Sequence, residues 1–295
     1  MSRPPPHPFY PVLALLIAAS FWGMVWYPLR WLEARGMDGL WTTLIAYAAS
    51  LLLVLLLGGR RLLELRRYPV ASLMLMFAVG WCNVAFVLAI IEGEVVRVLL
   101  LFYLSPAWTV LFGRLILGER LHPGIGLLLL MAMAGSLFLL WTPGTGFVWP
   151  PQRADLLALT SGMGFALSNV LVRHMQAVSL TAKILASWIG VVLVAAGGVL
   201  LVGDPVPRVD GITLGGAVLL GIVGFLAATY AVQYGVTHMP VQRSAVILLS
   251  ELVVGGVSAA GLAGEALGMR DYLGGGLILL AGYLVTVIRE KETHG

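Results

Sequence analysis

Residues 104–121, LSPAWTVLFGRLILGERL, have a counterpart 146 positions later at residues 250–267, SELVVGGVSAAGLAGEAL. The shift brings the Gly-Glu pairs of the two stretches into register. Similarity at a fixed spacing is the signature of an internal repeat, in which each copy builds the same structural unit. The sequence therefore predicts two related halves, residues 1–146 and residues 147–295.

The composition of the chain is that of a protein embedded in lipid. Of its 295 residues, 60% are hydrophobic and only 11% are charged, and the mean hydropathy is +0.96. Soluble globular proteins carry about 25% charged residues, so this composition excludes a soluble enzyme, a nucleic-acid-binding protein and a disordered chain. We predict an integral membrane protein with the lipid bilayer around it and no nucleic acid partner.

Ten apolar segments are long enough to cross the bilayer as helices. A hydrocarbon core about 30 Å thick needs roughly 20 apolar residues for each helical span. The predicted spans are 11–32, 41–57, 70–91, 95–117, 123–141, 155–178, 181–202, 212–236, 242–263 and 272–288. The predicted fold class is therefore all-α integral membrane, with ten transmembrane helices. Because each half has an odd number of spans, the second half enters the membrane in the opposite direction, and the five-helix repeats have inverted topology.

The basic residues orient this topology, because short cytoplasmic loops are enriched in Lys and Arg. With the N-terminus inside, the cytoplasmic side holds Arg3, Arg60, Arg61, Arg66, Arg67, Arg114, Arg120, Arg173, Lys183, Arg243, Arg289 and Lys291. The outer side holds Arg30, Arg35, Arg97, Arg153, Arg208 and Arg270. This twofold excess predicts a multi-pass protein of the inner membrane with both termini in the cytoplasm.

Inverted repeats indicate transport. They are typical of secondary transporters, whose substrate site lies near the middle of the membrane where the two halves meet. The alternative is a duplication that only stabilises the fold. A membrane enzyme or a lipid scramblase is a different class, and the repeat argues against both.

The motifs of the repeat resemble those of a known family. Leu104-Ser105-Pro106 is followed by Gly118-Glu119, and the second half carries a second Gly-Glu pair. This pattern resembles the EamA module of the drug/metabolite transporter superfamily, and within it the chain looks most like the YddG-type aromatic amino-acid exporters. The resemblance implies a cavity lined by spans 1, 3, 4, 6, 8 and 9 and alternating access. It also implies export of amino acids, aromatic and other neutral ones, or similar small metabolites.

Glu251 is the single acidic residue well inside a predicted span. An ionisable group at the centre of a membrane helix costs about 2.5–3.5 kcal/mol on insertion scales, so it faces protein or water rather than lipid. Three roles remain open for it: binding the ammonium group of a substrate, carrying a proton, or a structural hydrogen bond between helices. A buried carboxylate among aromatic rings also suits the runner-up function, efflux of lipophilic organic cations or drugs.

Aromatic and polar side chains inside the spans complete the predicted site. A shift of 144 places Tyr230 of the eighth span on Phe86 of the third, so both faces offer rings to the same region. Rings can stack on an apolar body and hold an ammonium group, although Trp and Tyr also anchor helices at headgroups. The predicted substrate-binding residues are Trp22, Trp26, Trp81, Asn83, Phe86, Tyr103, Ser105, Asn169, Tyr230, Tyr234 and Glu251.

Proline and charged residues at span positions suggest mechanical roles. Pro106 is the predicted hinge of the fourth span, and Pro28 is expected to kink the first, because proline interrupts the hydrogen bonds of a helix. Glu265 is expected to cap a span and hold a loop through Arg270. Arg97 is interpreted as a headgroup anchor or a gate.

The sequence lacks the residue patterns of other chemistries. The five histidines lie in tails or near span ends, without partners at the spacing of a metal site or a proton relay. No phosphate-binding glycine loop is present. We therefore predict a transporter that is not an enzyme, needs no cofactor or metal, acts on a small-molecule substrate and is compatible with a monomer.

Overall fold

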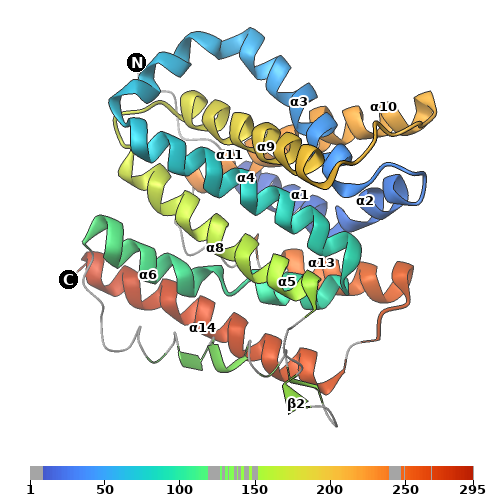
Figure 1. Cartoon of the computed structure of the whole chain (residues 1–295). Helices are drawn as coiled ribbons and strands as arrows, with labels where there is room; N and C mark the ends of the chain where they lie inside the picture. The colour runs from blue at the N-terminus through green and yellow to red at the C-terminus, as the bar shows by residue number, and fades with distance from the viewer. Residues whose placement is uncertain are drawn as a thin grey trace.

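The structure is a computed structural model, and it describes residues 9–118, 152–238 and 247–294 apart from 249 and 267, with isolated residues between 127 and 147. Its described part is a bundle of helices (Figure 1). Among the described residues, seven helical stretches are long and apolar enough to cross a membrane, and some of them consist of two or three consecutive elements. The predicted span 123–141 and the start of span 242–263 lie largely outside the described residues, so the number of ten stays a prediction.

The described elements follow the predicted spans closely. The first half contains α1 (Phe9–Met24), α2 (Trp26–Glu33), α3 (Gly39–Gly58), the 3₁₀ helix η1 (Gly59–Arg67), α4 (Pro69–Glu92), α5 (Val95–Phe102) and α6 (Ser105–Leu117). The second half contains α8 (Arg153–His174), α9 (Leu180–Val202), α10 (Gly211–Leu219), the π-helix η2 (Leu220–Phe225), α11 (Leu226–His238), α13 (Ser250–Ser258), the π-helix η3 (Ala259–Ala263) and α14 (Met269–His294). Between them, β1 (Trp141–Thr142) and β2 (Gly146–Phe147) pair antiparallel, a small departure from the all-α prediction.

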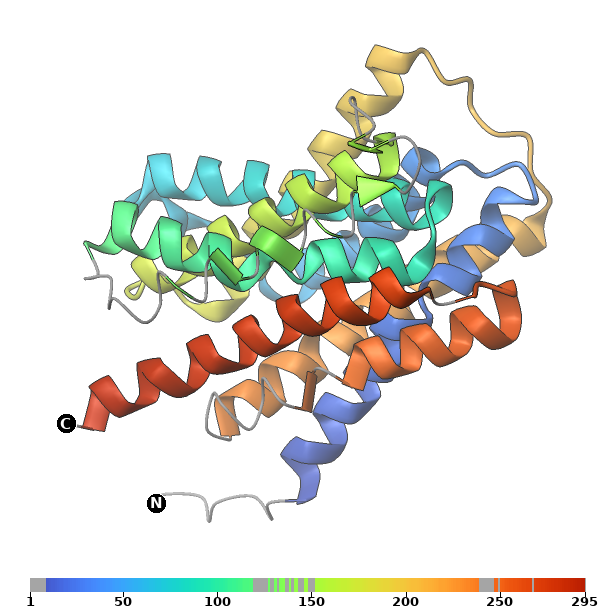
Figure 2. The same cartoon turned by 90° about the horizontal axis from the view of Figure 1, so that it is seen from below.

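The chain runs back and forth between two ends of the bundle. The η1 end holds η1, the C-terminal ends of α6 and α8 and the start of α9. The α2 end holds the C-terminal ends of α2 and α4 and the starts of α5, α8 and α10. Figure 1 shows α6 ending on the left and α2 and α10 on the right, and the turned view of Figure 2 shows the same two ends, with α14 (red) running between them. Helices of the two halves interleave, because α4 packs against α8 and α9, and α1 packs against α11 and α13.

Two prolines explain why the first and fourth spans are interrupted. A proline ring clashes with the carbonyl group four residues before it and donates no backbone hydrogen bond. Pro28 lies four residues after Met24, where α1 ends, and Pro106 lies four residues after Phe102, where α5 ends. The predicted break in the fourth span is therefore present, and a hinge motion at Pro106 stays a prediction.

Glycines allow the interleaved helices to approach closely. A side chain at Gly190 of α9 would overlap the Met76 carbonyl of α4, and one at Gly80 would overlap the backbone of Gly190. Gly164 of α8 meets Ala78 of α4 in the same way. Small residues at such contacts are the usual means of packing helices in lipid, where apolar surface alone gives no preference for protein over the bilayer.

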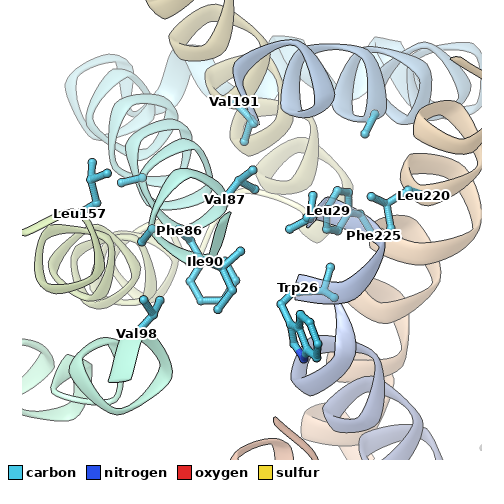
Figure 3. Packing of buried hydrophobic residues seen from close by; sticks show 14 of the residues in the cluster. Trp26, Leu29, Phe86, Val87, Ile90, Val98, Leu157, Val191, Leu220 and Phe225 are labelled. Carbon is cyan, nitrogen blue, oxygen red and sulfur yellow. The ribbon is translucent and has the colours of Figure 1, made fainter. Parts of the chain in front are cut away.

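The main hydrophobic core extends to the α2 end of the bundle. Leu29 of α2, Ile90 of α4 and Val98 of α5 are each no more than 1% exposed, and they belong to one cluster with Phe86 and Phe225. Figure 3 shows these side chains gathered between α2, α4, α5 and the second half. Side chains at the α2 end are therefore packed with almost no exposed surface.

Candidate substrate-binding cavity

A cavity of about 460 Å³ lies where the two halves meet. Its polar lining residues are Tyr47, Asn83, Tyr103, Ser105, Ser168, Asn169, Ser187, Thr229 and Glu251. Its aromatic lining residues also include Trp22, Phe86, Phe102, Phe165, Trp188 and Tyr283. The lining comes from α1, α4, the α5–α6 break, α8, α11 and α13, as the resemblance implied, and additionally from α3, α9 and α14. Pockets that bind small molecules have this character, mostly apolar walls with a few placed polar groups.

Glu251 lies on this cavity and is held from the opposite half of the chain. The hydroxyl of Tyr103 donates a hydrogen bond of 2.9 Å to Oε2 of Glu251, and it lies 3.3 Å from the carbonyl oxygen of Leu248. Tyr103 sits in the break between α5 and α6 that Pro106 imposes. The backbone of Glu251 also packs closely against Gly23 of α1. A Cβ atom at Gly23 would lie only 2.6 Å from the carbonyl oxygen of Glu251. The first half of the chain therefore holds Glu251 of the second half, through α1 and the α5–α6 break.

A second polar group on the cavity is the amide of Asn83. Its Nδ2 donates to the carbonyl of Val79 one turn earlier at 2.9 Å, and its Oδ1 accepts a hydrogen bond from the hydroxyl of Tyr47. Asn169 of α8 also lines the cavity and is exposed to it. These amides offer neutral donors and acceptors on walls other than that of Glu251.

Aromatic rings form two groups on the walls. Phe102 at the end of α5 contacts Phe86 and Phe165, with ring centroids 5.3 Å apart in both pairs. On another side, Phe225 of the π-helix η2 is stacked between Trp22, at 5.6 Å, and Tyr47, at 4.8 Å. Such pairs fix ring orientations, which keeps the apolar surface of the cavity in a defined shape.

Seven of the predicted binding residues lie together on this cavity: Trp22, Asn83, Phe86, Tyr103, Ser105, Asn169 and Glu251. Four do not. Trp26 is 3% exposed and donates a hydrogen bond of 3.0 Å from Nε1 to Oγ of Ser258, so it joins α2 to α13. Trp81 packs against the main core.

Tyr230 and Tyr234 are 49% and 37% exposed and do not line the cavity. Instead, Thr229 and Val232 of α11 face it. The π-helix η2 precedes α11, and its wider turn changes which face of the following helix points inward. The sequence shift of 144 residues between α4 and α11 therefore predicts the wrong inward face of α11, because α4 contains no π-helical turn.

The structure also brings in residues that the sequence did not single out. Tyr47, Phe102, Phe165 and Trp188 line the cavity, and only their aromatic character inside a span could have indicated them. The predicted contact of Glu265 with Arg270 lies outside the described side chains. The carboxylate of Glu265 reaches the first half of the chain, where it accepts a hydrogen bond from the backbone N–H of Val95. Arg97 forms a bidentate ion pair with Asp155, at 2.7 and 2.9 Å.

Both halves of the chain are similar to one family of known proteins. Residues 9–141 and 152–287 each match the EamA-like transporter family. The chain belongs to the EamA-like transporter family. The two matches together cover most of the chain, with one copy of the family unit in each half. The protein is therefore a membrane transporter of small molecules.

No curated protein matches the chain. A solved structure described only as "Crystal structure of protein" is similar, with a TM-score of 0.60 and 20% sequence identity, over 94% of this chain and 97% of that chain. At this identity the likeness supports the fold of this EamA-like transporter, and it carries no information on substrate.

Proposed function

We propose that this EamA-like protein is a ten-span secondary transporter with two inverted halves. It exports amino acids, aromatic and other neutral ones, or similar small metabolites across the inner membrane by alternating access. The observation that carries the substrate assignment is the carboxylate of Glu251 on a cavity of about 460 Å³ among aromatic walls. The resemblance to YddG-type exporters supports amino acids as the substrate class and export as the direction.

The cavity offers separate places for the parts of an amino acid. The ammonium group binds at Glu251, where Tyr103 holds one carboxylate oxygen and leaves the other oxygen for the substrate. A charge-assisted hydrogen bond in a site of low dielectric is stronger than a neutral one, so this contact orients the substrate. The side chain of the substrate stacks among Phe86, Phe102 and Phe165.

Efflux of organic cations remains the second candidate, and one observation favours it. Among the described lining residues, Glu251 is the only one with a charged side chain. The carboxylate of an amino acid would therefore meet neutral donors such as Asn83 and Asn169, whereas a lipophilic cation needs no such partner. Both candidates use the same carboxylate and the same rings.

The orientation of the bundle belongs to the same proposal. The η1 end carries Arg60, Arg61, Arg66 and Arg67 on one short helix, and we assign it to the cytoplasm. Excess basic charge in short loops marks the cytoplasmic side. Both termini then face the cytoplasm, and the α2 end faces outward.

A flux assay distinguishes these candidates. The purified protein is placed in liposomes loaded with a panel of neutral amino acids or quaternary ammonium compounds, and flux is measured with and without a pH gradient. We expect flux of aromatic amino acids that is lost in Glu251→Gln and retained in Glu92→Gln, a matched loss of a carboxylate at a helix end. Flux of quaternary ammonium compounds alone would move the assignment to cation efflux. Unchanged transport in Glu251→Gln would remove the carboxylate from the site.

A further inference from the structure

Glu265 makes a contact between the two halves at the α2 end. It follows Gly264, whose φ of +68° ends η3 in the left-handed conformation that glycine adopts readily. Its Oε1 accepts a hydrogen bond of 3.1 Å from the backbone N–H of Val95, and its Oε2 lies 3.5 Å from that of Val96. The carboxylate of the second half therefore caps the N-terminus of α5 in the first half, where a negative charge is favourable.

Arg30 completes this cluster from α2. Its Nη1 lies 3.3 Å from Oε1 of Glu265, and the same guanidinium donates to the carbonyls of Ile90, at 3.2 Å, and Gly93. The side chains of Arg30 and Glu265 are only 29% and 16% exposed. One arginine and one glutamate thus join α2, α4, α5 and the end of η3.

The cavity and this cluster lie toward opposite ends of the bundle. The cavity lining includes Val172 in the last turn of α8 and Ile184 near the start of α9, which are both at the η1 end. Toward the α2 end, Leu29, Ile90 and Val98 pack in the core with almost no exposure. Buried side chains therefore separate the cavity from the α2 end, and the cavity lining reaches furthest toward the η1 end.

We propose that Glu265 is the lock of the α2 end, and that opening the cavity on this side requires Glu265 to leave Arg30 and the N-terminus of α5. The proposal rests on the proposed transport by alternating access. Its physical basis is that these contacts join the two halves only while the α2 end is closed. Removing contacts that one of two states makes shifts the population toward the other state.

The test measures access to the cavity from each side of the membrane. Asn169→Cys, in a Cys82→Ser background, places one thiol on the cavity. A membrane-impermeant maleimide is then applied to right-side-out and inside-out vesicles. We expect the parent to react faster from the side of the η1 end. Glu265→Gln should raise the rate from the α2 side about tenfold, the population change given by roughly 1.4 kcal/mol.

Asp210→Asn is the matched control. Asp210 pairs with Arg35 at 3.6 Å between the same two halves and at the same end, but the two side chains are 58% and 42% exposed. Exposed pairs contribute little, so this variant should label as the parent does. Arg30→Gln should act in the same direction as Glu265→Gln. If Glu265→Gln does not accumulate in the membrane, Glu265→Asp, which keeps the charge but shortens its reach, replaces it.

Two results would overturn the proposal: equal labelling of the parent from both sides, or folded Glu265 and Arg30 variants that label as the parent does. Labelling needs no substrate, so its outcome is separate from the flux assay. Asymmetric labelling together with no amino-acid flux would refute only the substrate assignment. Flux with symmetric labelling would refute only the lock.

Discussion

Breaking the ion pair between Arg97 of α5 and Asp155 of α8 by neutralising one partner should strongly destabilise the bundle. It is bidentate, with distances of 2.7 and 2.9 Å, and the side chain of Asp155 is 3% exposed while that of Arg97 is 18% exposed. Removing one partner of a buried pair leaves an uncompensated charge, which costs about 3–5 kcal/mol. We therefore expect Asp155→Asn, which keeps the shape and removes the charge, to lower the free energy of unfolding by about 3 kcal/mol.

The double variant Arg97→Gln/Asp155→Asn should be less destabilised than the sum of its single variants. It leaves no unpaired charge, because both members of the pair are neutral. Contacting residues show interaction energies of roughly 0.5–3 kcal/mol in such cycles, and a charged pair with this geometry should lie at the upper part of that range. The assay is reversible unfolding in mixed micelles, followed by tryptophan fluorescence.

The pair between Arg153 and Glu92 provides the control for this cycle. It joins the end of α4 to the start of α8, at 3.2 Å, but the side chain of Arg153 is 69% exposed. Glu92→Gln should therefore cost less than about 1 kcal/mol. The reasoning fails if Asp155→Asn costs no more than Glu92→Gln, or if the two single effects in the cycle simply add.

Three further predictions concern packing, the site and the hinge. Gly190→Ala should lower stability by about 1–3 kcal/mol, because its Cβ would overlap the α4 backbone, whereas Gly197→Ala, with open space around it, should be neutral in the same unfolding assay. Tyr103→Phe should raise the KM for transport about tenfold, since a hydrogen bond to a charged group contributes about 1.5–3 kcal/mol, and an unchanged KM would contradict its role in holding Glu251. Pro106→Ala should slow transport at saturating substrate without a comparable loss of stability, because it permits a continuous fourth helix; transport at the parent rate would argue against a hinge.

Local chemistry made several features predictable from the sequence. The break in the fourth span follows from Pro106, because the missing N–H and the clash with residue 102 act within a single turn of helix. Glu251 was identifiable as a cavity residue because a carboxylate inside an apolar span needs protein or water around it. Family membership was predictable from two motifs at one spacing, since both copies are visible in the sequence.

Other features could not be predicted, because they depend on which helix faces which. Trp22 and Trp26 lie one turn apart on the first span, yet Trp22 lines the cavity while Trp26 binds Ser258 across the interface. The interruption at Val25, between α1 and α2, separates them. Tyr230 was assigned to the wrong face because the π-turns of η2 are not visible in the hydrophobic pattern.

The amino-acid sequence was enough to predict a membrane protein, its internal repeat and a carboxylate inside a span. These follow from composition, spacing and the cost of burying charge, which are properties of single residues and short segments. Three contacts became visible only in the folded chain: Tyr103 with Glu251, Arg97 with Asp155, and Glu265 with the N-terminus of α5. Each of these contacts joins residues more than 50 positions apart, and their partners are chosen by the glycine-mediated packing of helices from the two halves.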